Sequence, residues 1–326
     1  MHNVAGERMR SAAVRVPGST SNLGGGFDCV AMAIDRFLDV AYEPGSGPLS
    51  VVRTDGAMPG EDLVAISFHR ALAARGLTPQ GVLRVRSGIP IGCGLGSSAA
   101  ALVAGTALGE LAAGAALDPR AAFGPAMAEE GHGDNAGASA YGGLIGVVGE
   151  HEAPRVVSLD LSPAIGFAFA APPTRVSTRA ARAALPASVP HGVAVGSLAR
   201  IAALLLGLAK GEPELLRSGF QDALHVPYRL PLIPGGEDAI AAAVQAGAWA
   251  GTVSGAGSGL LAVCAPEDAA RISDAMAASL AARHGRTDIV SFPLRAVPQG
   301  VRSITWEDAG AATMASEPRA AVVGRD

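Results

Sequence analysis

The sequence predicts a two-domain protein in which helices and strands alternate along the chain, and three observations support this fold class. The 326 residues suffice for two domains of ordinary size. Apolar residues make up 49% of the chain but aromatic residues only 4%, so alanine and small aliphatic side chains supply the core, as in α/β enzymes. Strand-like and helical stretches follow one another, and the Pro172-Pro173 pair indicates a change of domain near residue 160.

The first domain is expected to span residues 1–160. Short apolar runs, or an alternation of apolar and polar side chains, predict strands at 12–16, 37–42, 81–86, 144–149 and 155–160. Helical periodicity and composition predict helices at 28–34, 63–75 and 98–113. Asp118 and Pro119 predict the start of one more helix, because aspartate is a good N-cap and proline fits the first helical position.

The second domain is expected to span residues 161–304. Strands are predicted at 165–170 and 289–296, and residues 251–263 combine a strand with a glycine loop. Helices are predicted at 194–209, 214–223, 238–246 and 267–283. Residues 305–326 have little periodic apolar content, so we expect a poorly ordered tail.

Composition narrows the class of function. The net charge is −4 and no basic block occurs, which disfavours a nucleic-acid surface and favours small-molecule chemistry. Cys29, Cys93 and Cys264 are widely spaced, so neither a zinc site nor a disulfide framework is expected. The N-terminal residues lack the apolar core of an export signal, which predicts a cytoplasmic protein.

A glycine-rich loop before the helix at 98–113 is the strongest candidate for a binding site. Gly92, Gly94 and Gly96 occupy every second position, so the backbone can approach a ligand closely. The following helix directs unpaired N–H groups and a partial positive charge towards an anion. A P-loop would need Gly-Lys-Ser/Thr, but the only lysine of the chain is Lys210. A triphosphate held here would therefore depend on backbone, serines, a metal and arginines.

Two other interpretations of this loop stay open. The first is a structural tight turn with no ligand. The second is a membrane span, since residues 87–109 carry no charge; however, the apolar run proper covers only 99–111, the length of a buried core helix.

Three further segments concentrate residues that suit binding or catalysis. Residues 17–28 form a glycine-rich loop that contains Asn22 and Asp28, and residues 254–259 form another that contains Gly255 and Gly257. Residues 129–135 combine two glutamates, a histidine, an aspartate and an amide within seven positions. By itself the loop at 254–259 is more typical of a tight turn. As a binding loop, it would approach the glycine-rich loop from the second domain.

Together these segments resemble the homoserine kinases of the GHMP kinase superfamily. The glycine-rich loop matches the superfamily pattern Pro-x-x-x-Gly-Leu-Gly-Ser-Ser-Ala-Ala from Pro90 to Ala100. The segments 20–28, 130–135 and 221–229 are similar to homoserine kinase motifs, and the resemblance covers about residues 12–303. It implies an α+β fold with an N-terminal domain like that of ribosomal protein S5 and a ferredoxin-like C-terminal domain, with the site between them.

The chain departs from the homoserine kinase pattern at four positions. Gly25, Gly133 and Ser258 stand where these enzymes usually carry proline, and Ala31 stands where they often carry glycine. Each lost proline alters mainly the entropy of the unfolded chain and the rigidity of a turn. These exchanges bear on substrate identity more than on kinase chemistry.

The resemblance implies an ATP site with magnesium. The implied ATP-binding residues are Pro90, Ile91, Gly92, Cys93, Gly94, Leu95, Gly96, Ser97, Ser98, Ala99 and Ala100. Ser98 and Glu130 match the family's magnesium ligands, and oxygen ligands of this kind suit Mg²⁺. Glu129 is the competing ligand, because only one of two neighbouring helix positions can face the site.

The resemblance also implies an acceptor site for an amino acid with a terminal hydroxyl. Arg182 and Arg229 match the family's carboxylate-binding arginines, with Arg179 close enough to compete with the first. Asp28 would hold the ammonium group and Asn22 the hydroxyl. The remaining implied substrate-binding residues are His132, Asn135, Gly255 and Gly257.

Asn22, Asp28 and Asn135 are the implied catalytic residues. Asn135 stands where mevalonate kinase-like members use an aspartate base, so the existence of a base stays open, with Asp134 as its neighbour. A loose transition state for phosphoryl transfer needs little early removal of the proton.

The expected function is therefore phosphorylation of L-homoserine by ATP to O-phospho-L-homoserine, on the route to threonine. Two alternatives stay open: a GHMP kinase for threonine, 4-hydroxythreonine or an isoprenoid alcohol, and a non-catalytic nucleotide-binding regulator. The expected partners are the small-molecule substrates alone, with no nucleic acid and no membrane, and a homodimer is possible.

Overall fold

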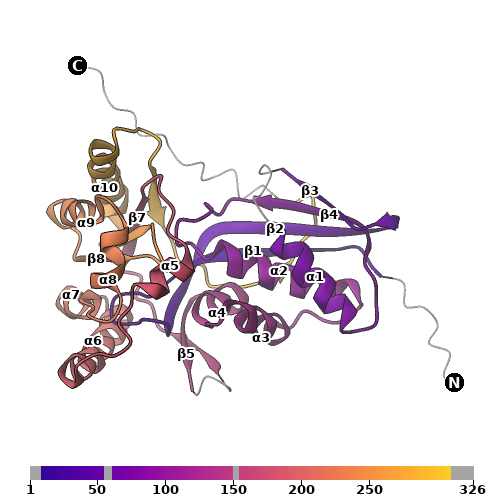
Figure 1. Cartoon of the computed structure of the whole chain (residues 1–326), viewed down its shortest axis with the longest axis horizontal. Helices are drawn as coiled ribbons and strands as arrows, with labels where there is room; N and C mark the ends of the chain where they lie inside the picture. Colours follow the sequence, from indigo (N-terminus) through magenta and orange to yellow (C-terminus); the bar gives the residue numbers. More distant parts are fainter. Residues whose placement is uncertain (1–8, 55–60, 150–153, 310–326) are drawn as a thin grey trace.

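The computed structural model describes residues 9–54, 61–149 and 154–309, which form two sheets with helices packed against them (Figure 1). The first sheet has seven strands in the order β11-β1-β2-β4-β3, with β5 paired to β2 and β6 paired to β5. Its strands are β1 (Ala12–Ser21), β2 (Val30–Pro48), β3 (Ser50–Arg53), β4 (Gln80–Ser87), β5 (Leu144–Val148), β6 (Arg155–Leu159) and β11 (Arg302–Ser303). All pairs are antiparallel except β3 with β4.

Four helices pack together and against this sheet. They are α1 (Leu63–Ala73), α2 (Ser97–Ala112), α3 (Pro119–Glu130) and α4 (Asp134–Tyr141). Helix α2 lies in the middle, packed on β1 and β2 and flanked by α1 and α3, and for this reason its alanines are buried. Asp118 caps α3 by accepting the Arg120 N–H at 2.9 Å, and this confirms the predicted start of the helix.

The second sheet has the strand order β10-β7-β9-β8 and is antiparallel throughout. Its strands are β7 (Gly166–Ala171), β8 (Ala250–Val253), β9 (Leu260–Cys264) and β10 (Val290–Leu294). Helices α9 (Gly236–Gln245) and α10 (Ala269–His284) pack against each other and on this sheet. The order of the fourth, first, third and second strand, with helices between them, is that of a ferredoxin-like domain. The predicted α+β fold is therefore confirmed.

Between β7 and β8 the chain forms further helices near the junction of the two sheets (Figure 1). These are α5 (Thr178–Ala183), α6 (His191–Lys210), α7 (Pro213–Phe220) and α8 (Val226–Arg229). A short 3₁₀ turn, η1 (Leu230–Leu232), follows α8. A second one, η2 (Pro266–Asp268), lies between β9 and α10. Helices α5 and α8 position Arg182 and Arg229, which the sequence had placed in the acceptor site.

After β10 the chain returns to the first sheet. Ala296 forms a bridge with Ile34, β11 pairs with β1, and Arg86 donates a hydrogen bond to the carbonyl of Ala309. The domain limits at residues 160 and 304 stay predictions. Most of the predicted tail, 310–326, lies outside the described residues, and 305–309 contain a turn.

The helix expected at 28–34 is wrong, because this segment begins strand β2. Asp28 has φ +55°, a left-handed conformation that does not occur inside an α-helix, and from Val30 onwards the chain pairs with β1 and β5. Residues Val30–Ile34 are all buried, so both faces of the strand are apolar and no alternation marked it as a strand. The sequence analysis also missed α4, whose buried residues include a glycine and a serine, Gly137 and Ser139.

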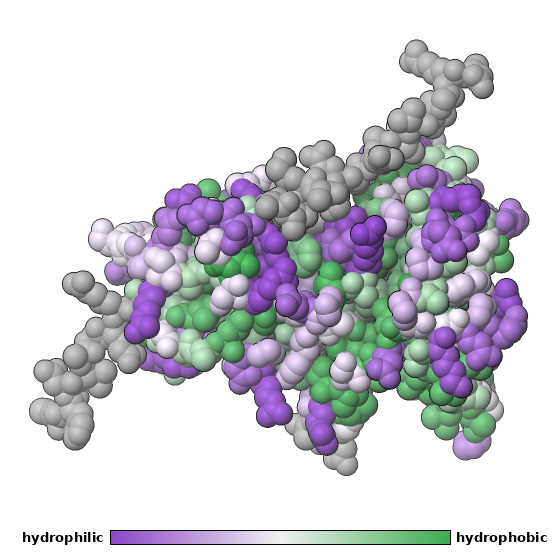
Figure 2. Space-filling model, turned by 180° about the vertical axis from the view of Figure 1, so that it is seen from behind, coloured by the Kyte–Doolittle hydropathy of each residue, from purple (hydrophilic) through white to green (hydrophobic). Residues whose placement is uncertain are grey.

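One helix within the described ranges, α6, is long and apolar enough to cross a membrane by length and composition. Only 22% of its apolar window is buried, and Val195, Leu198 and Leu206 are exposed. A single such helix is weak evidence for a membrane protein, and α6 packs along α7. Seen from behind, hydrophobic side chains gather in the middle of the face and at its lower right, with hydrophilic ones spread between them and around the rim (Figure 2).

Candidate active site

The glycine-rich loop before α2 has the backbone conformation that its glycine pattern predicts. Gly92, Gly94 and Gly96 have φ angles of +75°, +69° and +64°, a region that side-chain-bearing residues rarely adopt. Gly96 is the N-cap of α2, and no side chain of the described part of the chain caps this end. The first N–H groups of α2 are therefore available for an anion.

Gly94 also leaves no room for a side chain. A Cβ atom there would lie 2.0 Å from the carbonyl oxygen of Ser254, which belongs to the second domain. The glycine-rich loop and the loop at 254–259 are thus in backbone contact.

We expect Gly94→Ala to lower the free energy of unfolding by about 2–4 kcal/mol, because the clash adds to the left-handed strain. Gly285→Ala is the matched control: Gly285 has φ +61° but nothing lies within 4 Å of its added Cβ, so strain alone should cost about 1 kcal/mol. Urea unfolding of both variants measures the difference. Equal losses of unfolding free energy in the two variants would show that the contact with Ser254 does not contribute to stability.

The three glycine-rich segments meet through buried hydroxyl groups. The hydroxyl groups of Thr20 and Ser254 lie 2.9 Å apart, and the Ser254 hydroxyl donates to the carbonyl of Gly94 at 2.7 Å. The N–H of Gly255 donates to the carbonyl of Ser21 at 2.9 Å. The loop at 254–259 therefore approaches the glycine-rich loop from the second domain, as predicted.

A cavity of about 270 Å³ opens where these segments meet, and both halves of the chain line it. Most of the predicted site residues are among its lining: Asn22, Asp28, Gly92, Gly94, Leu95, Gly96, Ser97, Ser98, Glu130, His132, Asn135, Arg182, Arg229, Gly255 and Gly257. The other predicted ATP-site residues do not line it: Pro90, Ile91, Cys93, Ala99 and Ala100. Ala99 and Ala100 are fully buried in the core beneath the loop.

Four lining residues escaped the sequence analysis: Val176, Ser177, Thr178 and Ala256. Ser177 is the N-cap of α5 and accepts the N–H of Ala180 at 3.1 Å. A serine three positions before an alanine-rich stretch was the pattern that could have revealed this segment.

Glu130, rather than Glu129, faces the cavity. The Glu129 carboxylate forms an exposed ion pair with Arg70. Burial raises the pKa of Glu130, and a hydrogen bond with Ser98 and the charge of His132 oppose this rise. A cation beside Glu130 would favour its ionised form.

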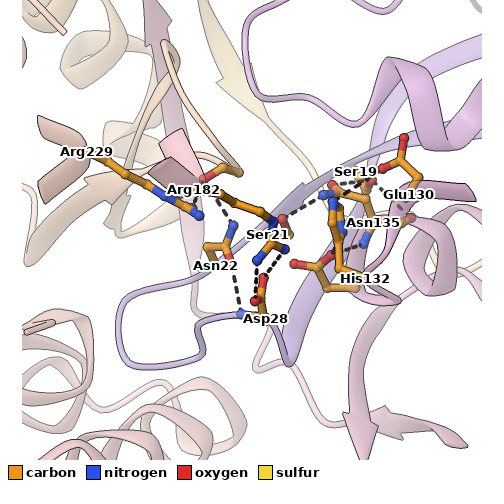
Figure 3. A network of polar contacts seen from close by, with 11 residues as sticks. Ser19, Ser21, Asn22, Asp28, Glu130, His132, Asn135, Arg182 and Arg229 are labelled. Carbon is orange, nitrogen blue, oxygen red and sulfur yellow. Dashed lines mark hydrogen bonds and ion pairs between the residues drawn. The ribbon is translucent and has the colours of Figure 1, made fainter. Parts of the chain in front are cut away.

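His132 lies between two carboxylates (Figure 3). Its Nδ1 is 2.7 Å from Asp134 Oδ1, and its Nε2 is 3.6 Å from Glu130 Oε2. Burial works against the charged imidazolium, but the hydrogen bond and charge of Asp134 and the charge of Glu130 outweigh it and raise the pKa of His132. The ring therefore carries positive charge into this corner of the cavity over a wider pH range than a free histidine.

Asp28 and Arg182 form a two-fold ion pair at the mouth of the cavity. Arg182 donates to the two carboxylate oxygens of Asp28 at 3.0 and 2.9 Å (Figure 3). About a third of each side chain is exposed, so the pair is open to a ligand. Arg179 is exposed on the same helix and does not line the cavity, so Arg182 is the arginine that α5 presents to the site.

Asn22 and Asn135 are held by hydrogen bonds at the floor of the site. Asn22 has φ +60°, accepts the N–H of Asp28 at 2.8 Å and donates to the carbonyl of Gly255 at 3.1 Å. The Asn135 amide accepts from the Ser19 hydroxyl at 2.9 Å and donates to the Ser21 hydroxyl at 2.8 Å. Asn135 thus fixes β1 against α4.

Arg229 is only 1% exposed, yet it lines the cavity. It donates to the carbonyl of Gly255 at 2.9 Å and stacks over Phe27, with its guanidinium carbon 5.0 Å from the ring centre. His225 stacks on the same phenyl ring and bonds the carbonyl of Gly24 at 3.1 Å. Through these contacts, the 221–229 segment holds the loop that carries Asp28 in position.

We expect the stability of the wild-type chain to fall more steeply than that of His225→Gln when the pH drops from about 7.5 to 5.5. Burial lowers the pKa of His225. The negative charge of Asp222 opposes this lowering but does not cancel it. The unfolded chain, with a histidine pKa of about 6.5, then takes up a proton that the folded chain refuses, so folding loses stability as the pH falls through that value.

Urea unfolding at several pH values measures this slope, which one histidine can change by at most about 1.4 kcal/mol per pH unit. Parallel curves for the two proteins would show that His225 titrates alike in both states.

The donor set suits magnesium held jointly with a phosphate chain. The described residues contain no group of three or more histidine, cysteine or acidic side chains that could hold a metal by itself. Magnesium in kinases is usually held by one or two carboxylates together with substrate phosphates and water, and Glu130 with Ser98 offers such a partial site. The site thus fits a nucleotide-bound Mg²⁺ better than a resident metal.

Comparison with known proteins agrees with this class of site. Residues 63–143 match the model of the GHMP kinases N terminal domain, and residues 203–282 match that of the GHMP kinases C terminal. A homoserine kinase structure from Cytophaga hutchinsonii superimposes with a TM-score of 0.75 at 24% identity, covering 93% of this chain and 99% of that one. A mevalonate kinase from L. major reaches 0.68 at 16% identity, covering 90% and 98%. The fold and the two family models define a GHMP kinase, an ATP-dependent enzyme.

The sequence relatives narrow this class. The homoserine kinase of Thermus thermophilus is 38% identical over 266 residues, which cover 81% of this chain and 90% of the relative. That of Moorella thermoacetica is 38% identical over 273 residues, which cover 82% and 92%. The chain belongs to the homoserine kinase family.

Proposed function

We propose that this chain transfers the γ-phosphoryl group of ATP to the side-chain hydroxyl of L-homoserine, giving O-phospho-L-homoserine for threonine synthesis. The observation that carries the proposal is the Asp28–Arg182 pair beside the glycine-rich loop, in one cavity with Arg229. A carboxylate and a guanidinium at the same place suit a zwitterionic amino acid. The family relationship supports the same acceptor.

When the acceptor binds, its charged groups replace the ion pair between Asp28 and Arg182. The Asp28 carboxylate accepts the α-ammonium group, and Arg182 and Arg229 bind the α-carboxylate. Arg229 is already oriented by the carbonyl of Gly255 and by Phe27, so little side-chain entropy is lost on binding. Asn22 holds the hydroxyl, while its own position is set by Asp28 and Gly255.

The triphosphate lies along the loop from Gly92 to Gly96, against the start of α2. The uncapped N–H groups of α2 bind its oxygens, and the Ser97 and Ser98 hydroxyls add donors. Glu130 and Ser98 are the side chains that would hold Mg²⁺, which when bound neutralises charge on the phosphate oxygens. Residues of both domains line the cavity, so it can place the acceptor hydroxyl next to the γ-phosphate.

No strong base is needed for this transfer. Asn135 is neutral and hydrogen-bonded to Ser19 and Ser21, so it positions the site rather than removing a proton. Asp134 is fully buried and does not line the cavity, and its Oδ1 binds His132 and the N–H of Asn135. Positioning and charge stabilisation supply the catalysis, as expected for a loose transition state.

The proposed setting is the cytoplasm, with ATP and L-homoserine as small-molecule partners. The exposed apolar residues of α6 are compatible with the expected homodimer.

An ADP-release assay with a panel of amino-acid, sugar and isoprenoid alcohols tests the proposed function. We expect turnover with L-homoserine to exceed that with threonine, 4-hydroxythreonine or mevalonate at equal concentration. Turnover of another alcohol without turnover of homoserine would favour a different GHMP kinase. Binding of ATP with no turnover across the panel would favour the non-catalytic regulator.

A further inference from the structure

The glycine-rich loop has no lysine, and the structure places an arginine from the second domain against it. Arg175 precedes α5, and its side chain lies over the loop: a Cβ atom on Gly92 would be 2.8 Å from Arg175 Cδ and 3.3 Å from Nε. Burial raises the pKa of Cys93, and the positive charge of Arg175 partly offsets this rise, as expected for a cation beside the loop.

The guanidinium of Arg175 is uncommitted within the described ranges, where it has no hydrogen bond or ion pair with any side chain. The two arginines that line the site cavity are engaged, since Arg182 is paired with Asp28 and Arg229 is bonded to Gly255. Lys210, the only lysine, lies at the far end of α6. Within the described part of the chain, Arg175 is therefore a cation that contacts the loop and has no ion-pair partner.

The backbone before Arg175 is fixed. The Ser258 hydroxyl donates to the carbonyl of Thr174, which ties this segment to the loop at 254–259. The side chain also borders a second cavity of about 500 Å³, which shares Gly92, Val176 and Ser177 with the first. The Arg175 side chain thus lies between the glycine-rich loop and this second cavity.

We propose that Arg175 binds the phosphate chain of ATP from the second domain and supplies the cation that a P-loop lysine would provide. This inference rests on the proposed function, because it needs the triphosphate to lie on the Gly92–Gly96 loop. A guanidinium presents paired donors to phosphate oxygens and adds affinity without taking part in the bond-making step.

Titration of wild type, Arg175→Ala and Arg175→Lys with a non-hydrolysable ATP analogue and Mg²⁺, followed by calorimetry, tests the proposal. We expect the Kd of Arg175→Ala to rise about tenfold, the loss typical of one charge-assisted contact, and Arg175→Lys to recover part of it. In steady-state assays the KM for ATP should rise while the KM for the acceptor stays within about twofold.

Arg179→Ala is the matched control, because Arg179 is exposed on the same segment but lines neither cavity. An unchanged Kd for Arg175→Ala, or an equal rise for Arg179→Ala, would overturn the inference alone. Equal weakening by lysine and alanine at position 175 would also overturn it, since charge would then have no role. A wild-type chain that binds no ATP analogue would overturn the proposed function and this inference together.

Discussion

The Glu130→Gln variant is expected to lose roughly 10²–10³-fold in kcat, the usual loss when one electrostatic stabiliser of a transition state is removed. Glutamine keeps the size and the hydrogen bond to Ser98 but removes the charge that would hold Mg²⁺. Because burial already raises the pKa of Glu130, the neutral variant should fold at least as well as the wild type. Steady-state kinetics over a range of magnesium concentrations measures the effect.

Glu129→Gln is the control for this variant. Glu129 is the neighbouring position on α3, but its carboxylate is exposed and paired with Arg70. Surface ion pairs contribute about 0–1 kcal/mol, so we expect activity within about twofold of the wild type. Equal losses of kcat in the two variants, or a loss only in Glu129→Gln, would contradict the assignment of Glu130 as the magnesium ligand.

Removal of Arg182 is the second large change that we expect. Arg182→Ala should raise the KM for L-homoserine about 10²-fold, since charge-assisted hydrogen bonds contribute about 1.5–3 kcal/mol each. The carboxylate-free analogue homoserinol should be affected far less, because it keeps the hydroxyl and the ammonium group but has nothing for Arg182 to bind. The KM for ATP should stay within about twofold.

Two comparisons make this prediction specific. Arg179→Ala removes an exposed arginine three positions earlier on α5 and should leave both acceptors unchanged. Arg182→Lys keeps the charge but not the planar fork, so it should recover only part of the affinity. If Arg182→Ala raises the KM for homoserine and for homoserinol equally, the arginine acts on the shape of the site rather than on the substrate carboxylate.

The glycine-rich loop could be predicted in detail because its conformation is dictated locally. Gly92, Gly94 and Gly96 all adopt positive φ, and the helix follows at Ser97, one residue before the expected start. The same holds for α3, whose capping aspartate and first-turn proline fixed its start correctly. Motifs of this kind record requirements of the local backbone, to which the close approach of Ser254 adds a distant one at Gly94.

The choice between Glu129 and Glu130 needed the structure. Adjacent helix positions have the same composition and propensity, and only the partner Arg70, 59 residues earlier in the chain, shows which one faces solvent. The pairing of Asp28 with Arg182 spans 154 residues and leaves no pattern in the sequence. The sequence predicted both side chains as anchors but not that each is the other's partner before a substrate arrives.

Strand β2 shows where sequence patterns mislead. Its first residues are buried on both faces, so the two-residue period that identifies a half-exposed strand is absent. Alanine and methionine in this stretch favour a helix locally, but pairing with β1 on one side and β5 on the other determines the outcome. Arg175 was missed for a different reason: it carries no motif, and only its contact with Gly92 marks it.

The most direct test of this account is to identify the product of the purified chain with Mg-ATP and L-homoserine. Phosphorus NMR, with mass spectrometry of the same mixture, distinguishes a phosphate ester on the side-chain hydroxyl from inorganic phosphate. The account predicts O-phospho-L-homoserine in amounts equal to the ADP formed. ADP with only inorganic phosphate, or no ADP above the acceptor-free background while another alcohol is phosphorylated, would contradict it.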